Sequence, residues 1–336
     1  MRISFSKSVT ESLLAKIRSG EMMSRNEKFN LIIQLSIPSI LAQVTTVLMF
    51  YIDAGMVGSL GAEPSAAIGL VEPATWLFFS LVSAVTMGFS VQVAHFIGAN
   101  DFAKARAVMR HGYIFGLCFA LLLLLITFLI GSRLPVWLGG GADIQHDATV
   151  YFLIFSLIIP FHLIEYMSAA MLKVSGDMRR PSSMAILMCV LDVIFNYFFI
   201  FPTRTVSLFG VEVTMPGLGE GVAGAALGSL LSFVCVALPL AYYAIFRSPI
   251  LAWKQDVERF VWRWQYIWNA MKIGAPMALQ YLLMNGAQLV STMIVAPLGN
   301  IAIAAHSFAI TAESLCYMPG YGISEAATTL VGQSVG

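Results

Sequence analysis

Apolar residues form eight long runs along the chain, separated by shorter polar stretches. A helix needs roughly 20 apolar residues to cross the hydrocarbon layer of a membrane, and every run reaches that length. We therefore predict an all-α polytopic membrane protein with eight transmembrane helices. The runs cover approximately residues 31–57, 66–97, 107–130, 148–174, 182–201, 222–246, 267–296 and 302–335.

Prolines occur inside six of these runs, where each one removes a backbone hydrogen bond and favours a kink. Membrane helices tolerate such breaks because neighbouring groups satisfy the freed carbonyl. The prolines are Pro38, Pro73, Pro160, Pro239, Pro276 and Pro319.

The composition is that of a protein whose surface faces lipid. Hydrophobic residues make up 58% of the chain and charged residues 11%, against about 25% charged residues in soluble domains. The first thirty residues are a polar tail without the apolar core of a secretory signal. We expect a short amphipathic helix in this tail, through Leu13, Leu14 and Ile17. The net charge of +1 gives no reason to expect a nucleic-acid partner.

The basic residues fall almost entirely on one side of the predicted spans. Seventeen of the 19 Lys and Arg residues lie in the tail and in the loops after the second, fourth and sixth runs, whereas Arg133 and Arg204 lie on the other side. The positive-inside rule therefore predicts a multi-pass protein of the plasma (inner) membrane with a cytoplasmic N-terminus.

The chain also contains an internal repeat. At an offset of 238 residues, Pro38 aligns with Pro276, and the pair at 60–61 with the Leu-Gly pair at 298–299. The seventh and eighth runs thus resemble the first and second, which indicates a parallel repeat of six-helix units. We expect twelve helices in a complete protein, eight of which are in this C-terminally shortened sequence. The predicted parts are a cytoplasmic tail (1–30), an N-lobe bundle (31–246), a linker (247–266) and a partial C-lobe (267–336).

Six carboxylates fall within the predicted spans. A charge at the bilayer centre costs about 2.5–3.5 kcal/mol on insertion scales, so such residues need a reason to be there. We expect no Lys or Arg at sufficient depth to neutralise them, and an excess of acids is typical of sites that handle a cation or a proton. The six are Asp53, Glu72, Glu165, Asp192, Glu313 and Glu325.

Depth brings two of these acids together with two other polar residues. Counted from the outer ends of their spans, Asp53, Asp192, Asn196 and Ser229 share a layer roughly 6–14 Å deep. Asp192 and Asn196 lie on one helix face. Their oxygens are suited to Na⁺, or the two acids could hold one proton. The alternative is structural, with Asp53 capping a helix and the other side chains joining helices. Glu313 lies near mid-span and is a further candidate.

We find no motif for an enzyme or a metal site. The spans contain no nucleophile–base pair, and the five histidines lack metal-ligand spacing. We expect neither catalysis nor a cofactor, apart from Na⁺ or H⁺ as a coupling ion.

Several segments, in order and at these spacings, resemble the multidrug and toxic compound extrusion (MATE) transporters of prokaryotes. They are IPSILAQ (37–43), MFYIDAGMVGSLG (49–61), QVAHFIGANDFAKAR (92–106), KVSGDMRRP (173–181), GVAGAALGS (221–229) and the segment from AHSF to the last residue (305–336).

The resemblance implies a two-lobed antiporter that exports organic cations and drugs in exchange for Na⁺ or H⁺ by alternating access. It implies that Asp53 is the main coupling acid and that Pro38 is a hinge. The family's Asn-x-x-x-Asp in the fifth span is here Asp192 to Asn196, with the residue types exchanged, and Ser229 stands where a threonine is frequent. We expect a monomer in the lipid bilayer.

In the second repeat, Glu313 matches an acid of one prokaryotic branch and is a possible second-lobe site. Two alternatives to the antiporter remain open. One is a flippase for lipid-linked oligosaccharides from the same superfamily, although such proteins carry cationic residues in the cavity. The other is a fragment that inserts into the membrane without transporting.

Overall fold

The computed structural model describes residues 7–208, 211–255 and 260–335. Arg2 and Arg259, counted above among the basic residues, and the terminal Gly336 lie outside the described residues. The elements are α1 (Lys7–Arg18), α2 (Arg25–Gly58), α3 (Ala62–Gly98), α4 (Phe102–Ile130), α5 (Leu134–Trp137), α6 (Gln145–Ser156), α7 (Ile158–Val174), α8 (Arg179–Ile200), β1 (Pro202–Leu208), β2 (Val211–Leu218), α9 (Gly221–Tyr242), η1 (Tyr243–Arg247), η2 (Trp253–Gln255), α10 (Trp264–Val295), η3 (Ala296–Leu298) and α11 (Asn300–Val335).

The helices confirm the eight predicted spans. Within the described residues, six helices are long and apolar enough to cross a membrane, and two bent helix pairs supply the others. The pair α6 and α7 is bent by 41°. Pro160 lies in the first turn of α7, and its missing N–H accounts for the break between the two helices. Pro38, in contrast, lies within one continuous helix, α2.

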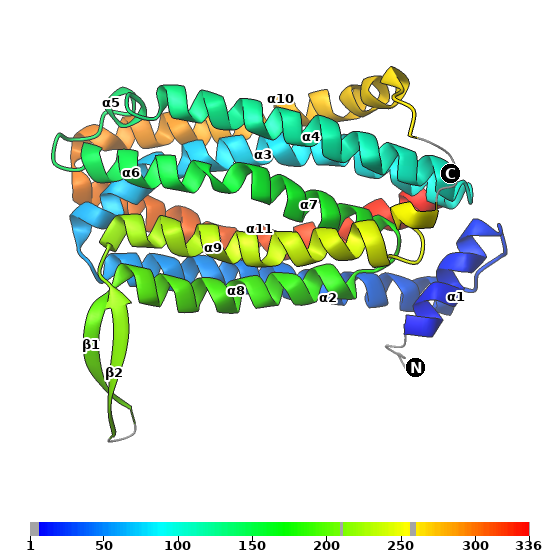
Figure 1. The fold of residues 1–336 in the computed structure, drawn as a ribbon, viewed down its shortest axis with the longest axis horizontal. Coiled ribbons are helices and arrows are strands. Elements are labelled where there is room, and N and C mark those ends of the chain that lie inside the picture. Colours follow the sequence, from blue (N-terminus) through cyan, green and yellow to red (C-terminus); the bar gives the residue numbers. More distant parts are fainter. Residues whose placement is uncertain (1–6, 209–210, 256–259, 336) are drawn as a thin grey trace.

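The spanning helices lie side by side in one bundle (Figure 1). Helix α1 and the C-terminus are at one end, and α5 and the β-hairpin are at the other. Arg133 and Arg204 belong to this second end, since Arg133 directly precedes α5 and Arg204 is in β1. The segregation of basic residues therefore matches the two ends of the bundle.

The antiparallel hairpin of β1 and β2 follows α8 and was not predicted from the sequence. Arg204 pairs with Met215 in its register. The Arg204 guanidinium lies 4.2 Å from the ring centre of Phe201 and donates a hydrogen bond to the Tyr197 hydroxyl at 3.0 Å. These contacts join the base of the hairpin to the end of α8.

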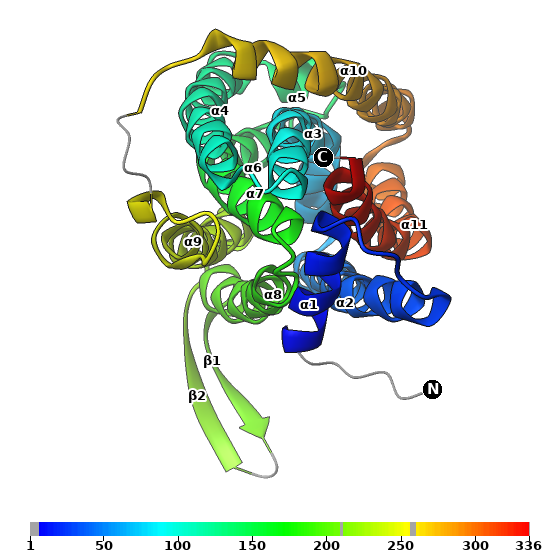
Figure 2. The ribbon, with the colours of Figure 1, turned by 90° about the vertical axis from the view of Figure 1, so that its right-hand side faces the viewer.

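Helix α3 lies in the middle of the bundle, and the second repeat packs onto it. Viewed along the bundle, α10 and α11 lie beside α3 and α2, while α9 is on the opposite side (Figure 2). A Cβ atom on Gly88 would collide with the backbone of Ala270, and one on Gly274 would approach the backbone of Ala84 to 2.8 Å. Small residues thus allow α3 and α10 to approach closely.

The predicted tail helix is α1, which packs at the end of the bundle that carries the C-terminus (Figure 1). Leu13 and Leu14 are buried in one cluster with Leu31 of α2 and Ala326 of α11. A Cβ on Gly176, in the turn between α7 and α8, would collide with Leu14. The tail therefore contacts both repeats through its apolar face.

Asp101 begins α4 in the turn after α3. Its carboxylate accepts a hydrogen bond from the backbone N–H of Lys104 and forms a 2.7 Å ion pair with the Lys104 ammonium. The Lys104 side chain lowers the pKa of the Asp101 carboxyl. Capping and charge together fix the start of this span.

Candidate functional site

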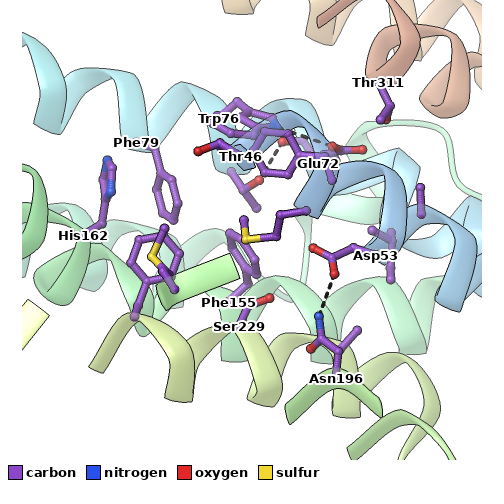
Figure 3. A pocket seen from close by; sticks show the side chains of 18 of the residues that line it. Thr46, Asp53, Glu72, Trp76, Phe79, Phe155, His162, Asn196, Ser229 and Thr311 are labelled. Carbon is purple, nitrogen blue, oxygen red and sulfur yellow. Dashed lines mark hydrogen bonds between the residues drawn. The ribbon is translucent and has the colours of Figure 1, made fainter. Parts of the chain in front are cut away.

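A cavity of about 270 Å³ runs inside the bundle, between the first spans and the second repeat. Its walls come from α2, α3, α6, α7, α8, α9 and α11. Most of the lining residues are apolar or aromatic, and Figure 3 shows polar side chains such as Asp53, Glu72 and Asn196 among them. The charged residues among the described lining are Asp53, Glu72, Glu165, Lys173 and Glu325.

The predicted outer layer is present and is joined by one amide. The Asn196 side-chain N–H₂ group donates to Asp53 Oδ1 at 2.9 Å and to Asp192 Oδ2 at 2.8 Å. The two carboxyl groups therefore share one amide donor. Asp192 and Asn196 are each 1% exposed, whereas Asp53 lines the cavity (Figure 3). The depth of these residues in their spans, counted along the sequence, therefore identified three side chains that lie in contact.

Two hydroxyls complete this layer. Ser229 lines the cavity and lies one turn before Ser232 on α9. Ser232 donates a hydrogen bond to Asp192 Oδ1 at 3.1 Å and was missed from the sequence. Its position three residues after Ser229 was the available signal, since residues at i and i+3 share a helix face.

Glycines on α9 make the layer possible. A Cβ on Gly228 would come within 2.8 Å of the Asn196 backbone nitrogen, and one on Gly224 would collide with the backbone of Phe199. As the Gly224–Gly228 spacing predicts, α8 and α9 approach closely. This approach brings Asp192 beside the hydroxyls of α9.

Glu72 faces the same cavity from α3. Its carboxylate accepts a hydrogen bond from Ser307 of α11 at 2.9 Å and a longer one from Trp76 at 3.4 Å. Counting from the outer end of its span would have placed Glu72 about six residues deep, near the level of the predicted layer.

Aromatic rings form much of the remaining wall. Trp76 packs edge-on against Phe50, with ring centres 5.2 Å apart. Phe155 stacks with Tyr151 at 5.3 Å and with Phe79 at 5.5 Å. Such a wall offers π-faces to a flat or cationic ligand.

The far end of the cavity departs from the sequence-based expectation. Lys173 of α7 forms a 2.6 Å ion pair with Glu325 of α11, so the expectation that no basic residue neutralises an intramembrane acid is wrong for Glu325. Lys173 lies in the last turn of the apolar helix α7, and its long side chain lines the cavity. Nearby, Gln333 donates to the Val174 carbonyl at 2.7 Å and Thr329 to the Lys173 carbonyl at 3.1 Å.

Two other predicted residues lie apart from the outer layer. Glu313 of α11 is exposed and does not line the cavity. Pro38 is in α2, fifteen residues before Asp53, at the opposite end of the cavity from the layer. The structure thus gathers Asp53, Asp192, Asn196 and Ser229, but not these two residues.

Fold and cavity together define a polytopic helical membrane protein with an acidic, aromatic-lined interior. The MatE family model matches residues 38–198 and 276–336, more than half of the chain. The chain therefore belongs to the MatE family, the MATE transporters.

Curated relatives agree with this assignment. The chain is 27% identical to a "Probable multidrug resistance protein NorM" of Thermotoga maritima, over 90% of this chain and 62% of the relative. It is 31% identical to a protein of that name from Pseudomonas aeruginosa, over 91% of this chain and 60% of the relative. The chain thus spans less than two thirds of the length of these proteins.

Solved structures share the fold. The outward-facing conformation of a multidrug resistance MATE family transporter of the MOP superfamily superposes with a TM-score of 0.80, at 22% identity over 98% of this chain and 67% of the other. A MOP superfamily transporter from Pyrococcus furiosus gives 0.79, at 23% identity over the same shares.

Proposed function

We propose that this chain carries the ion-coupling half of an antiporter that exports organic cations and drugs in exchange for Na⁺ or H⁺. One observation carries the proposal: Asp53 and Asp192 are joined by Asn196 at the wall of a lipid-embedded cavity. No basic side chain among the described residues forms an ion pair with either acid. A bound cation would compensate this concentration of acids.

The layer offers two chemistries for the coupling ion. Two carboxyl groups that share one amide donor repel each other when both are charged, and one proton on the pair relieves this repulsion. Na⁺ instead needs oxygen ligands, which the carboxylates and the Ser229 and Ser232 hydroxyls supply. The Asn196 amide donates both of its hydrogens to the acids, so it would have to turn over to offer its oxygen to Na⁺. The present geometry therefore favours a proton.

The transport cycle that we propose is alternating access. Ion binding to the layer changes the relative stability of the inward-open and outward-open states, and Pro38 is the hinge in α2 through which the change bends the helix. We place the N-terminus in the cytoplasm and the protein in the plasma membrane as a monomer. The basic end of the bundle, which carries α1, supports this orientation.

The alternative of a flippase for lipid-linked sugars is less well supported. Such a substrate carries a pyrophosphate and needs cationic groups in the cavity. The one Lys or Arg among the described lining residues is Lys173, and it is already paired with Glu325.

The test is export of a fluorescent organic cation from cells that express the chain. We expect Asp53→Asn to abolish export that depends on a Na⁺ or proton gradient while membrane insertion is unchanged. Cells with an empty vector give the baseline rate of export. If cells with the wild-type chain export only at this rate, the chain is a non-transporting fragment. Full export by the Asp53→Asn variant would refute the coupling role of this acid.

A further inference from the structure

Glu72 is an acid of the cavity that the ion-coupling layer does not use. It lies on α3, and its two hydrogen-bond donors are Ser307 and Trp76. Neither donor is charged, and no Lys or Arg among the described residues forms an ion pair with it. A carboxylate in this setting has no positive partner among the described residues to neutralise it.

The surroundings of Glu72 are aromatic. Figure 3 shows Trp76 and Glu72 on the same side of the cavity, with Phe155 facing them. Trp76 also contacts the rings of Phe50 and Phe79, at 5.2 and 6.2 Å between ring centres. Carboxylate and π-faces together suit a positive charge spread over a bulky apolar group, because both attract it and neither needs a hydrogen-bond donor from it.

The other acids of the cavity are less suited to this role. Glu325 is neutralised by Lys173 at 2.6 Å. Glu165 lies on the same helix as Lys173, two turns away, towards the same end of the cavity. Asp53 is bound to Asn196 in the ion-coupling layer. Glu72 is the acid that combines aromatic neighbours with the absence of a charged partner among the described residues.

We propose that Glu72 and Trp76 form the binding site for the positive group of an aromatic organic cation, separate from the Asp53 layer. The inference rests on the proposed function and adds a second acid with its own ligand. Glu72 and Asp53 line the same cavity. A cation at one site therefore opposes a cation at the other, which is the exchange that antiport requires.

Ser307 gives the site a link between the two repeats. Its hydroxyl, on α11, is hydrogen-bonded to Glu72 on α3, and a cation that takes the carboxylate competes with this bond. Binding of the cation thus weakens a contact between the first and second repeats. Removal of the hydroxyl frees Glu72 and tightens cation binding.

The test is equilibrium binding of tetraphenylphosphonium to the purified full chain, without an ion gradient. We expect Glu72→Gln to weaken binding about tenfold or more, and Trp76→Leu about three- to tenfold. Ser307→Ala should tighten binding about threefold, a direction that damage to the fold would not give. Glu63→Gln is the matched control, since Glu63 is an exposed acid at the start of the same helix.

A neutral probe of similar shape, triphenylphosphine oxide, separates charge from packing. Its affinity should be the same for wild type and Glu72→Gln.

Unchanged tetraphenylphosphonium binding in Glu72→Gln overturns the proposed binding site. If that variant does not fold, unchanged binding in both Trp76→Leu and Ser307→Ala overturns it instead. If binding depends on Glu72 but neither Na⁺ nor pH affects it, the antiport function is refuted and the binding site stands. If a Glu72→Gln variant exports the cation along an ion gradient and binds it with unchanged affinity, the antiport function stands and the binding site is refuted.

Discussion

At the residue scale, the proposed function depends on how one amide is placed between two acids. Asn196 donates to both Asp53 and Asp192, so it stabilises the layer when no cation is bound. The exchange of Asp and Asn relative to the family pattern leaves two acids and one amide in the same small volume. The exchange changes which helix position carries the charge, and the amount of charge is unchanged.

We predict that Asn196→Ala destabilises the protein by about 2 kcal/mol, because two buried carboxyl groups lose their common donor. The double exchange Asp192→Asn with Asn196→Asp keeps every group type and should unfold close to the wild type. Thermal unfolding in detergent measures both variants. A wild-type melting temperature for Asn196→Ala would contradict the role of the amide.

At the scale of elements, close packing of α8 and α9 sets the geometry of the layer. Gly228 lies directly against the backbone of Asn196. A methyl group at this position has no space, so it must separate the helices or move Asn196. The spacing of small residues in α9 is therefore a requirement of the site as well as of packing.

Gly228→Ala should lower the free energy of unfolding by about 1–3 kcal/mol through overpacking, despite the better helix propensity of alanine. It should also weaken binding of the coupling ion, as measured by the concentration needed for half-maximal export. The control is Gly286→Ala on α10, where no atom lies within 4 Å of the added Cβ. This variant should keep both its stability and its affinity for the coupling ion. Equal behaviour of the two variants would show that the close approach is unimportant.

The sequence predicted the elements well where hydropathy decides the structure. The eight spans, the tail helix through Leu13 and Leu14, and the meeting of Asp53 with Asn196 all follow from apolar length and depth in the membrane. The β-hairpin and the pairing of Lys173 with Glu325 did not follow. The hairpin is outside the spans, where hydropathy carries little information, and the ion pair joins residues 152 positions apart. Such pairing depends on how the repeats pack.

At the scale of the whole molecule, the two repeats meet at both ends of the cavity. Glu72 and Ser307 join them near the outer layer, and Lys173 and Glu325 join them at the other end. The Lys173 and Glu325 side chains are 15% and 21% exposed. A shielded pair of this kind joins α7 of the first repeat to α11 of the second.

A double-mutant cycle with Lys173→Met and Glu325→Gln tests this contact. We predict a coupling energy of about 2 kcal/mol or more, since either single change leaves a shielded charge without its partner. The exposed pair of Asp101 and Lys104, with side chains 33% and 53% exposed, should give less than about 1 kcal/mol in a parallel cycle. Additive effects at Lys173 and Glu325 would mean that the pair does not join the repeats.

The central claim is that the acids around Asp53 hold an ion that the arriving organic cation displaces. The most direct measurement is the release of protons or Na⁺ when tetraphenylphosphonium is added to the purified chain in weakly buffered solution. We predict that the wild type releases the coupling ion as the organic cation binds, and that Asp53→Asn binds the cation with no release. Binding by the wild type without any ion release, or equal release by Asp53→Asn, would contradict the account.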